Sequence, residues 1–348
     1  MNAQEIIDLI RNGESSTTQF KPDVSNSESI AQEIVAFANS KGGKILVGVD
    51  DKTGNIAGVE FRDIQRINNL VATAANDHVK SPVYVQSETI QIENKRIILI
   101  TVPEGTDKPH TDKDGLIFIK NGSDKRKVVS REELARLLQA SGNLYAEERI
   151  IRNSSVEDVD WEKFREFYEK KYKESFEKES LERYLQNLRL MEDGKLNIAG
   201  ALLFGRNPSK LIPSFYISAV WFRGTEITNQ EYKSSENITG TADILYRKAF
   251  DFIFSKLNKI QADQPFNSLG IPEIPEIVLK ELLVNAVIHR DYFISDSIKI
   301  FMFDDRIEIR NPGKLPNNLT IEQIRKGLRR SRNSTGFSVF VVFMLAEV

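Results

Sequence analysis

The sequence predicts an α+β protein with more than one domain, and three observations lead to this fold class. Helix-like and strand-like patterns alternate over roughly the first 140 residues. The chain then turns polar between Asn143 and Ser155, as linkers do. A strongly apolar helix-like segment, Glu276 to His289, is followed by a hairpin-like pattern. Because one core rarely serves more than about 250–300 residues, we predict three parts of the 348-residue chain, 1–142, 143–270 and 271–348.

Composition excludes several classes of protein. The chain has no cysteine, so disulfides, iron–sulfur clusters and thiolate zinc sites are ruled out. Its three histidines, His78, His110 and His289, are too few for a histidine-rich metal centre. No run of about 18 apolar residues suggests a membrane span, and the N-terminus lacks the layout of a signal peptide. We therefore predict a cytoplasmic protein without a membrane partner.

The first part of the chain indicates a compact mixed α/β domain. An amphipathic helix is expected at the N-terminus, and apolar residues recur at helical spacing from Ser29 to Asn39. Gly42 and Gly43 then end that helix, because glycine adopts the left-handed conformation that helix ends require. By the same criteria we predict helices at 29–39, 62–76 and 130–138, and strands at 45–49, 84–90, 96–102 and 115–120.

The middle part shows a second mixture of helix and strand signals after the polar linker. Its first helix carries a dense run of lysine and glutamate that is typical of a solvated face. We predict helices at 161–173, 181–191 and 242–257, and strands at 195–204 and 215–223.

The segment 276–289 is expected to be a helix that is apolar almost all round and mostly buried, with two polar residues on one face. Glu281 and Asn285 are four residues apart and therefore project one turn apart. Buried carboxylates and amides need partners, so the pair either caps a neighbouring loop or lines a pocket. In a pocket, Asn285 would offer an oxygen to Mg²⁺ and Glu281 would orient a water as general base.

A hairpin follows, with strands predicted at 297–303 and 306–310 and a loop that begins Asn311-Pro312-Gly313. The order of these features resembles that of the Bergerat-fold (GHKL) ATPases such as gyrase, MutL and the sensor kinases. In those proteins a helix with Glu and Asn is followed by a hairpin, and then by a polar residue and a glycine. The run LKELLVNA is similar to their first nucleotide-binding box. The resemblance implies ATP and Mg²⁺ as cofactors and an incomplete Bergerat-type α/β sandwich.

By this resemblance Glu281 matches the catalytic base, Asn285 the Mg²⁺ ligand, and Asn311 with Gly313 the box that reads the adenine amino group. Arg290, in the HRDY segment that follows the helix, could reach a phosphate or pair with a carboxylate. Asn311 stands where these ATPases carry aspartate; its carbonyl can still accept a hydrogen bond, but it carries no charge.

The glycine-rich lid of these ATPases has no counterpart before Val348, because Gly336 is the single glycine among residues 329–348. We therefore expect a C-terminally truncated module with weakened nucleotide binding and slow or absent hydrolysis. The sequence has no G-x-x-x-x-G-K-[ST] phosphate loop, so a helicase or AAA motor is unsupported. A sensor kinase is rejected because neither His78 nor His110 lies on a dimerising helix before the ATP module.

The segment 20–59 resembles the Schlafen-type AlbA domain, through FK, then AFAN-x-x-GG, then GVDD. Residues 117–123 and the basic run 125–127 match its closing strand and loop. The whole chain is similar to a bacterial group that pairs this domain with a degenerate Bergerat module, catalogued as divergent AAA proteins and putative transcriptional regulators. Since the formal net charge is −2, nucleic-acid contacts must come from local lysines and arginines; we nominate Lys21, Lys41, Lys44, Lys120, Lys125, Arg126 and Lys127.

Some Schlafen proteins are metal-dependent RNases that use three acidic residues. Glu14 and Gln19 align with the first two acids, and Asp50 or Asp51 lies near the third. The amide of Gln19 is a poor metal ligand and cannot act as a base, so a nuclease is the alternative to a binding protein. We predict a DNA- or RNA-binding, ATP-binding regulator or defence factor that forms homo-oligomers. A second alternative is an inactive scaffold that oligomerises through its middle helices.

Overall fold

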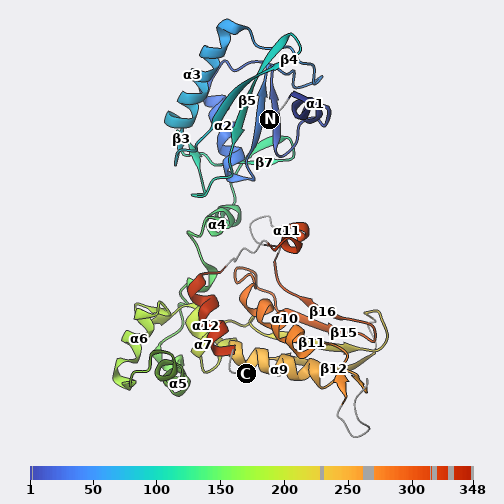
Figure 1. Ribbon diagram of the computed structural model, residues 1–348. Coiled ribbons are helices and arrows are strands. Elements are labelled where there is room, and N and C mark those ends of the chain that lie inside the picture. The colour runs from blue at the N-terminus through green and yellow to red at the C-terminus, as the bar shows by residue number, and fades with distance from the viewer. Residues whose placement is uncertain are drawn as a thin grey trace. The chain divides into compact units, whose positions relative to one another are not determined.

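A computed structural model describes residues 1, 3–227, 231–261, 270–313, 315, 320–327 and 333–345. The chain divides into two compact units, Met1–Leu144 (unit 1) and Tyr145–Val348 (unit 2), each described by itself (Figure 1). The domain boundaries given above stay predictions. In the described residues, every helix is too short or too polar to span a lipid bilayer.

Unit 1 is built on a four-stranded sheet with the order β1-β2-β5-β4. Strand β1 (Thr18–Lys21) runs parallel to β2 (Gly43–Val47), whereas β5 (Lys95–Val102) is antiparallel to both β2 and β4 (Gln86–Ile92). Side chains alternate between the faces of a strand, so Ile45 and Val47 enter one hydrophobic cluster and Leu46 enters another.

Helices cover both faces of this sheet. Helices α2 (Ser27–Asn39) and α3 (Phe61–Asp77) pack together over one face, and α1 (Ala3–Arg11) buries Ile6 against the other. Helix α4 (Arg131–Ala140) begins at a Ser130 cap. Two short strand pairs complete the unit: β3 (Val79–Lys80) with β6 (Thr111–Asp112), and β7 (Phe118–Asn121) with β8 (Asp124–Lys127).

Unit 2 contains a second four-stranded sheet with the order β12-β11-β15-β16. Strand β11 (Ile217–Phe222) pairs antiparallel with β12 (Tyr232–Ile238) and parallel with β15 (Ile298–Met302), which forms a hairpin with β16 (Ile307–Arg310). The middle and last parts of the sequence therefore share one sheet.

Helices α9 (Ala242–Phe254) and α10 (Glu276–Ile288) pack against each other and contact this sheet (Figure 1). Lys163 lies on α5 (Trp161–Tyr172), the first α-helix of the unit, and forms a buried ion pair with Asp243 of α9. This pair links the two helices. The remaining elements are α6 (Leu181–Asn187), α7 (Ile198–Phe204), α8 (Pro208–Leu211), α11 (Ile321–Arg325), α12 (Thr335–Leu345), β9 (Met191–Glu192), β10 (Lys195–Leu196), β13 (Lys259–Ile260), β14 (Ile271–Pro272), and the 3₁₀ turns η1 (Ala146–Glu148), η2 (Val156–Asp158) and η3 (Lys178–Ser180).

One predicted strand is wrong. Residues 195–204 form the two-residue strand β10 followed by helix α7, whose cap is the Asn197 side chain bonded to Gly200 N at 2.8 Å. Short apolar runs fit a buried strand and a buried helix equally well, and here the asparagine cap decides for helix. The other predicted helices and strands are confirmed in type, with shifted ends. Several elements were not predicted, among them β1, β12, α8, α11 and α12.

Candidate nucleotide and nucleic-acid sites

Glu281 and Asn285 lie on an open face of α10. Asn285 Nδ2 donates a hydrogen bond to Glu281 Oε1 at 3.0 Å, so the two polar side chains are each other's partners. Leu279 and Leu283 are buried on the opposite face, whereas Ile277 on the open side is 72% exposed. The helix is apolar as predicted, but the expectation that it is mostly buried is wrong. An amide whose nitrogen is engaged by Glu281 keeps its carbonyl oxygen for another partner.

Asn311 lies at the end of β16, beside the last turn of α10. Its Nδ2 donates to the Ala286 carbonyl at 2.9 Å, which brings Asn311 next to the helix that carries Asn285. Its Oδ1 is buried, and the described residues provide it with no donor. Gly313, two residues on, has a φ of 107°, which favours glycine. The loop thus presents one unsatisfied acceptor where the resemblance expects adenine recognition.

Arg290, considered above as a partner for a phosphate or a carboxylate, is held by backbone carbonyls of unit 2. The side chain is 1% exposed, and its guanidinium donates to the carbonyls of Ile294 at 3.2 Å and Ser214 at 3.4 Å. Burial lowers the pKa of Arg290. Because carbonyl groups of the fold surround the guanidinium, Arg290 fixes the loop after α10 and does not face an external phosphate.

The predicted absence of a lid falls largely on residues 314, 316–319 and 328–332, which lie outside the described residues. The neighbouring segment that is described includes α11 and the start of α12. There Glu147, in η1, accepts a hydrogen bond from Ser334 N, and burial raises the pKa of Glu147. The absence of a lid therefore stays a prediction.

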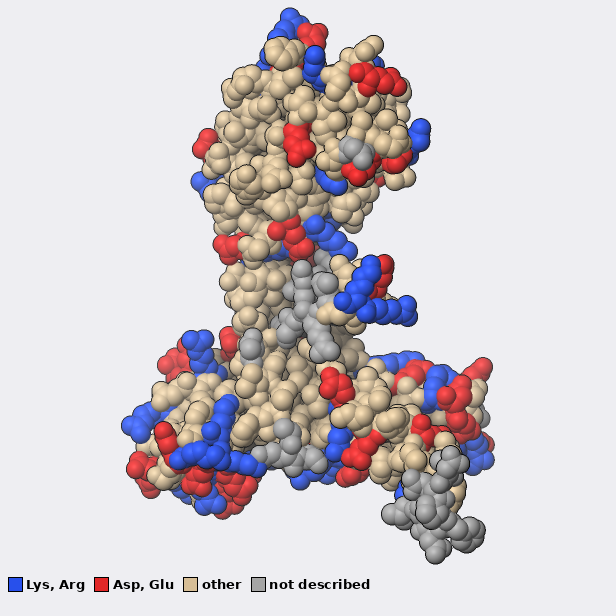
Figure 2. Space-filling model, viewed as in Figure 1, with Lys and Arg blue, Asp and Glu red and all other residues tan. Residues whose placement is uncertain are grey.

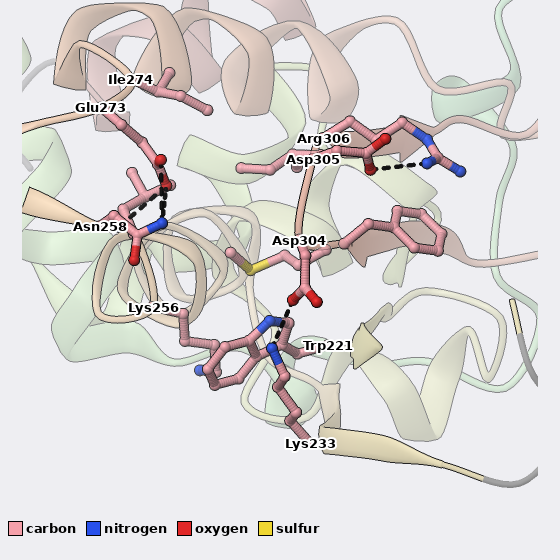
Figure 3. A pocket seen from close by; sticks show the side chains of 13 residues that line it. Trp221, Lys233, Lys256, Asn258, Glu273, Ile274, Asp304, Asp305 and Arg306 are labelled. Carbon is pink, nitrogen blue, oxygen red and sulfur yellow. Dashed lines mark hydrogen bonds and ion pairs between the residues drawn. The ribbon is translucent and has the colours of Figure 1, made fainter. Parts of the chain in front are cut away.

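A separate hollow of 420 Å³ lies at the turn of the β15–β16 hairpin. Lys233 lies 4.5 Å from the Trp221 ring and bonds Asp304 at 2.6 Å (Figure 3). That hydrogen bond lowers the pKa of Asp304. None of the predicted nucleotide residues lines this hollow, and no sequence motif points to it. Since the charged groups shown are largely paired with one another, we assign no ligand to it.

In unit 1 the AFAN-x-x-GG motif closes α2 onto the strands. Asn39 donates to the carbonyls of His110 at 2.8 Å and Phe118 at 3.0 Å, and accepts from His110 N at 2.8 Å. Gly42 has a φ of 72°, and a Cβ there would lie 2.7 Å from the Val102 carbonyl oxygen. A Cβ at Gly43 would collide with the Phe37 ring. The motif is explained by packing and buried hydrogen bonds.

The residues aligned with the nuclease acids only partly converge. Glu14 Oε1 accepts hydrogen bonds from the Gln19 amide and from Phe20 N, the latter at 2.7 Å. Asp50 instead caps its own turn, because its Oδ1 accepts from Thr53 N and Thr53 Oγ1, both at 2.7 Å. The hydrogen bonds from Thr53 lower the pKa of Asp50, and Asp51 is exposed.

No cluster of three or more His, Asp or Glu side chains with the proximity of metal ligands occurs among the residues that the structure describes. The Gln19 carbonyl oxygen is taken by Lys120 Nζ at 2.7 Å. The second position of the aligned triad thus holds an amide whose two ends are bound within the domain.

The nominated basic residues differ in accessibility. Lys120 is corrected from surface to interior: its side chain is 0% exposed, and burial lowers its pKa. Arg126 forms two hydrogen bonds to Glu133. Lys41 and Lys127 are exposed, Lys44 is half-buried, and Lys21 and Lys125 are partly exposed beside Glu33.

Figure 2 shows positive and negative side chains interspersed over the α5 and α6 region of unit 2.

Comparisons with known proteins find one matching family model in each of the two units. Residues 14–129 match the model of the Schlafen AlbA_2 family, and residues 295–347 match a family described as putative ATP-dependent DNA helicase recG C-terminal. No curated protein matches the chain.

Two solved structures are similar to this chain, one over nearly its whole length and one over a smaller share of it. A Corynebacterium diphtheriae protein is 21% identical, with 96% of this chain and 68% of that one covered and a TM-score of 0.43. The N-terminal domain of a putative ATP-dependent DNA helicase RecG-related protein from Nitrosomonas europaea is 22% identical, with 38% and 96% covered and a TM-score of 0.27. From the family matches, this chain carries a Schlafen AlbA_2 domain in unit 1 and a RecG-like HATPase_c_4 region in unit 2.

Proposed function

We propose that this protein binds nucleic acid through unit 1 and an adenine nucleotide through unit 2, and that it acts as a regulator, either in transcription or in defence. The family matches support both activities, since they cover most of unit 1 and the hairpin end of unit 2. The proposed role couples the two: nucleotide occupancy of unit 2 changes the affinity of unit 1 for DNA or RNA, or changes the oligomeric state.

The buried Asn311 Oδ1 carries the nucleotide half of this proposal. A buried acceptor without a donor costs on the order of 1–3 kcal/mol, and the exocyclic amino group of adenine is a donor that would satisfy it. Asn285 would hold Mg²⁺ through the carbonyl oxygen that Glu281 leaves free, and Mg²⁺ supplies charge neutralisation to bound phosphates. The residues present therefore fit ATP–Mg²⁺.

Hydrolysis is proposed to be slow or absent. Glu281 is exposed, and one of its oxygens is engaged by the Asn285 amide, so neither burial nor a neighbouring group prepares it as a base. Turnover of ATP that is measurable in the wild type and lost in Glu281→Ala would contradict this part of the proposal.

Calorimetric titration of the full chain with ATP–Mg²⁺ tests nucleotide binding. Asn311→Ala and Asn285→Ala are expected to weaken binding at least tenfold, about 1.4 kcal/mol. Asn237→Ala is the matched control, because Asn237 is an exposed amide on β12, the strand at the other edge of the same sheet. Equal affinity in all four proteins would refute the assigned site, and no heat of binding in the wild type would refute nucleotide binding itself.

The coupling is tested by titrating labelled DNA and RNA with the protein, with and without ATP–Mg²⁺. We expect a change in nucleic-acid affinity that Asn311→Ala abolishes. Light scattering of the same samples reports the oligomeric state. If ATP–Mg²⁺ changes neither affinity nor oligomeric state, the two units do not communicate and the regulatory proposal fails.

A further inference from the structure

Three lysines of unit 1 surround a single buried carboxylate. Glu33, on α2, has a side chain that is 5% exposed. Its Oε1 lies 3.2 Å from Lys125 Nζ of β8 and 3.8 Å from Lys21 Nζ of β1, and its Oε2 lies 3.8 Å from Lys120 Nζ of β7. Residues far apart in the sequence therefore meet at one point, and one carboxylate cannot neutralise three ammonium groups.

The three lysines divide into one that faces the interior and two that face outward. Lys120 is fully buried, bonds the Gln19 amide oxygen and lies 4.9 Å from the Phe37 ring. Lys21 and Lys125 have side chains that are 29% and 25% exposed. Glu14 and Asp124 also act on the charge of the buried Lys120. The positive charge that the cluster presents to solvent is therefore that of Lys21 and Lys125.

Both outward lysines retain hydrogen-bond donors. An ammonium group has three N–H donors. Lys125 uses one on Glu33 Oε1, and Lys21 is an ion-pair partner of the same oxygen at 3.8 Å, beyond hydrogen-bond range. Because both nitrogens are tied to the same carboxylate oxygen, their spacing is set before any ligand arrives, which reduces the entropy lost on binding.

We propose that Lys21 and Lys125 form a clamp for one phosphodiester group of a nucleic-acid backbone, and that Glu33 is the positioning residue that holds the clamp. This inference rests on the proposed nucleic-acid binding by unit 1 and names the site within it. Phosphate is the ligand chemistry that converging ammonium groups recognise, and it is common to DNA and RNA. The buried Glu33 contacts no nucleic acid; it acts through the two lysines.

The clamp makes a prediction about salt dependence that separate lysines do not. Each neutralised phosphate contributes about 0.9 to the slope of log affinity against log salt for duplex DNA, and about 0.7 for single strands. If Lys21 and Lys125 share one phosphate, the double variant Lys21→Gln/Lys125→Gln lowers the duplex slope by about 0.9. Two independent contacts would lower it by about 1.8.

Glu33→Gln separates positioning from simple charge compensation. The substitution adds one unit of net positive charge, so a carboxylate that merely weakens phosphate attraction would, when removed, give tighter binding. A positioning residue gives the opposite sign: we expect affinity to fall at least threefold. In the Lys21→Gln/Lys125→Gln background, Glu33→Gln should have no further effect, which a general loss of structure would not reproduce.

Fluorescence anisotropy of the full chain with a short mixed-sequence DNA duplex and with a single-stranded RNA, each over a salt series, measures these quantities. Lys80→Gln is the matched control, because Lys80 is an exposed lysine on β3 of unit 1, outside the Glu33 cluster and outside the nominated basic residues. Circular dichroism verifies folding, and the double variant Lys21→Gln/Lys125→Gln keeps the test valid if Glu33→Gln does not fold.

The outcomes separate the clamp from the wider function. Loss of about one phosphate contact in the double variant, together with weaker binding by Glu33→Gln, supports the clamp, and the stronger of the two arms identifies DNA or RNA. Any of three results overturns the clamp. Binding of the double lysine variant could equal that of the wild type, two phosphate contacts could be lost additively, or Glu33→Gln could bind more tightly. If the wild type binds neither probe, the proposed function of unit 1 falls with it.

Discussion

Asn39 offers a direct test of what the AFAN segment does. Asn39→Ala removes three buried hydrogen bonds, two to the carbonyls of His110 and Phe118 and one from His110 N. At about 1 kcal/mol net for each bond, the loss is about 3 kcal/mol, and more if the freed backbone groups stay dry. Since domains are stable by about 5–15 kcal/mol, this loss is a large fraction of the total.

The free energy of unfolding is best measured along a urea series by hydrogen–deuterium exchange read by mass spectrometry, because peptides of unit 1 are then separated from those of unit 2. Asn69→Ala is the control, an exposed asparagine on α3, and should change stability by less than about 0.5 kcal/mol. Asn39→Asp should lose as much as Asn39→Ala at neutral pH, because a carboxylate cannot donate to the two carbonyls. A loss below about 1 kcal/mol for Asn39→Ala would refute the reasoning.

Three further predictions concern other buried groups. Burial raises the pKa of Glu147, so the stability that this group contributes is complete below the ordinary carboxyl pKa and is lost as pH rises through the raised pKa. The melting temperature of Glu147→Gln, relative to that of the wild type, should therefore climb from acidic to alkaline pH. A constant difference between the two melting temperatures would contradict this. Burial alone would raise the pKa of Asp243, but the charge and hydrogen bond of Lys163, together with the hydrogen bond from Thr241, outweigh burial and lower that pKa. Asp243→Asn should cost about 3–5 kcal/mol in urea unfolding, with a deficit that shrinks as pH falls through the lowered pKa. No deficit at neutral pH would show that the pair is dispensable. Gly43→Ala should cost about 1–3 kcal/mol through overpacking, more than Gly336→Ala, whose Cβ would meet open space at a position without a positive φ. Equal urea midpoints for the two variants would argue against the close approach at residue 43.

Local patterns predicted most elements because apolar spacing and helix caps are short-range signals. The helix at 130–138 was predicted correctly, as were the hairpin and the loop at Asn311. The reason for the AFAN motif could not be read from spacing, because Asn39 bonds residues 71 and 79 positions away. The prediction of a strand at 195–204 was wrong for a different reason: an apolar run indicates that a segment is buried, but does not indicate which backbone conformation it takes.

Two site residues carried signals that were overlooked. Lys120 is two residues from the buried Phe118 on one strand, and side chains two apart share a face; that spacing already favours burial. Glu33 lies between Ile30 and Phe37, on the helix face that packs inward. By contrast, nothing near Arg290 in the sequence indicates that carbonyl groups from Ser214 and Ile294 surround it. Such contacts depend on the fold as a whole.

The parallel pairing of β11 with β15 limits how the protein can be divided for biochemical work. A fragment that begins at residue 271 keeps α10 and the hairpin but removes the neighbour of β15, so a row of backbone N–H and C=O groups is left unpaired. Exposed strand edges of this kind recruit strands from other molecules, and precipitation would then obscure any nucleotide titration. A fragment that begins at Tyr145 retains both neighbours of β15 and is the smaller piece suited to such measurements.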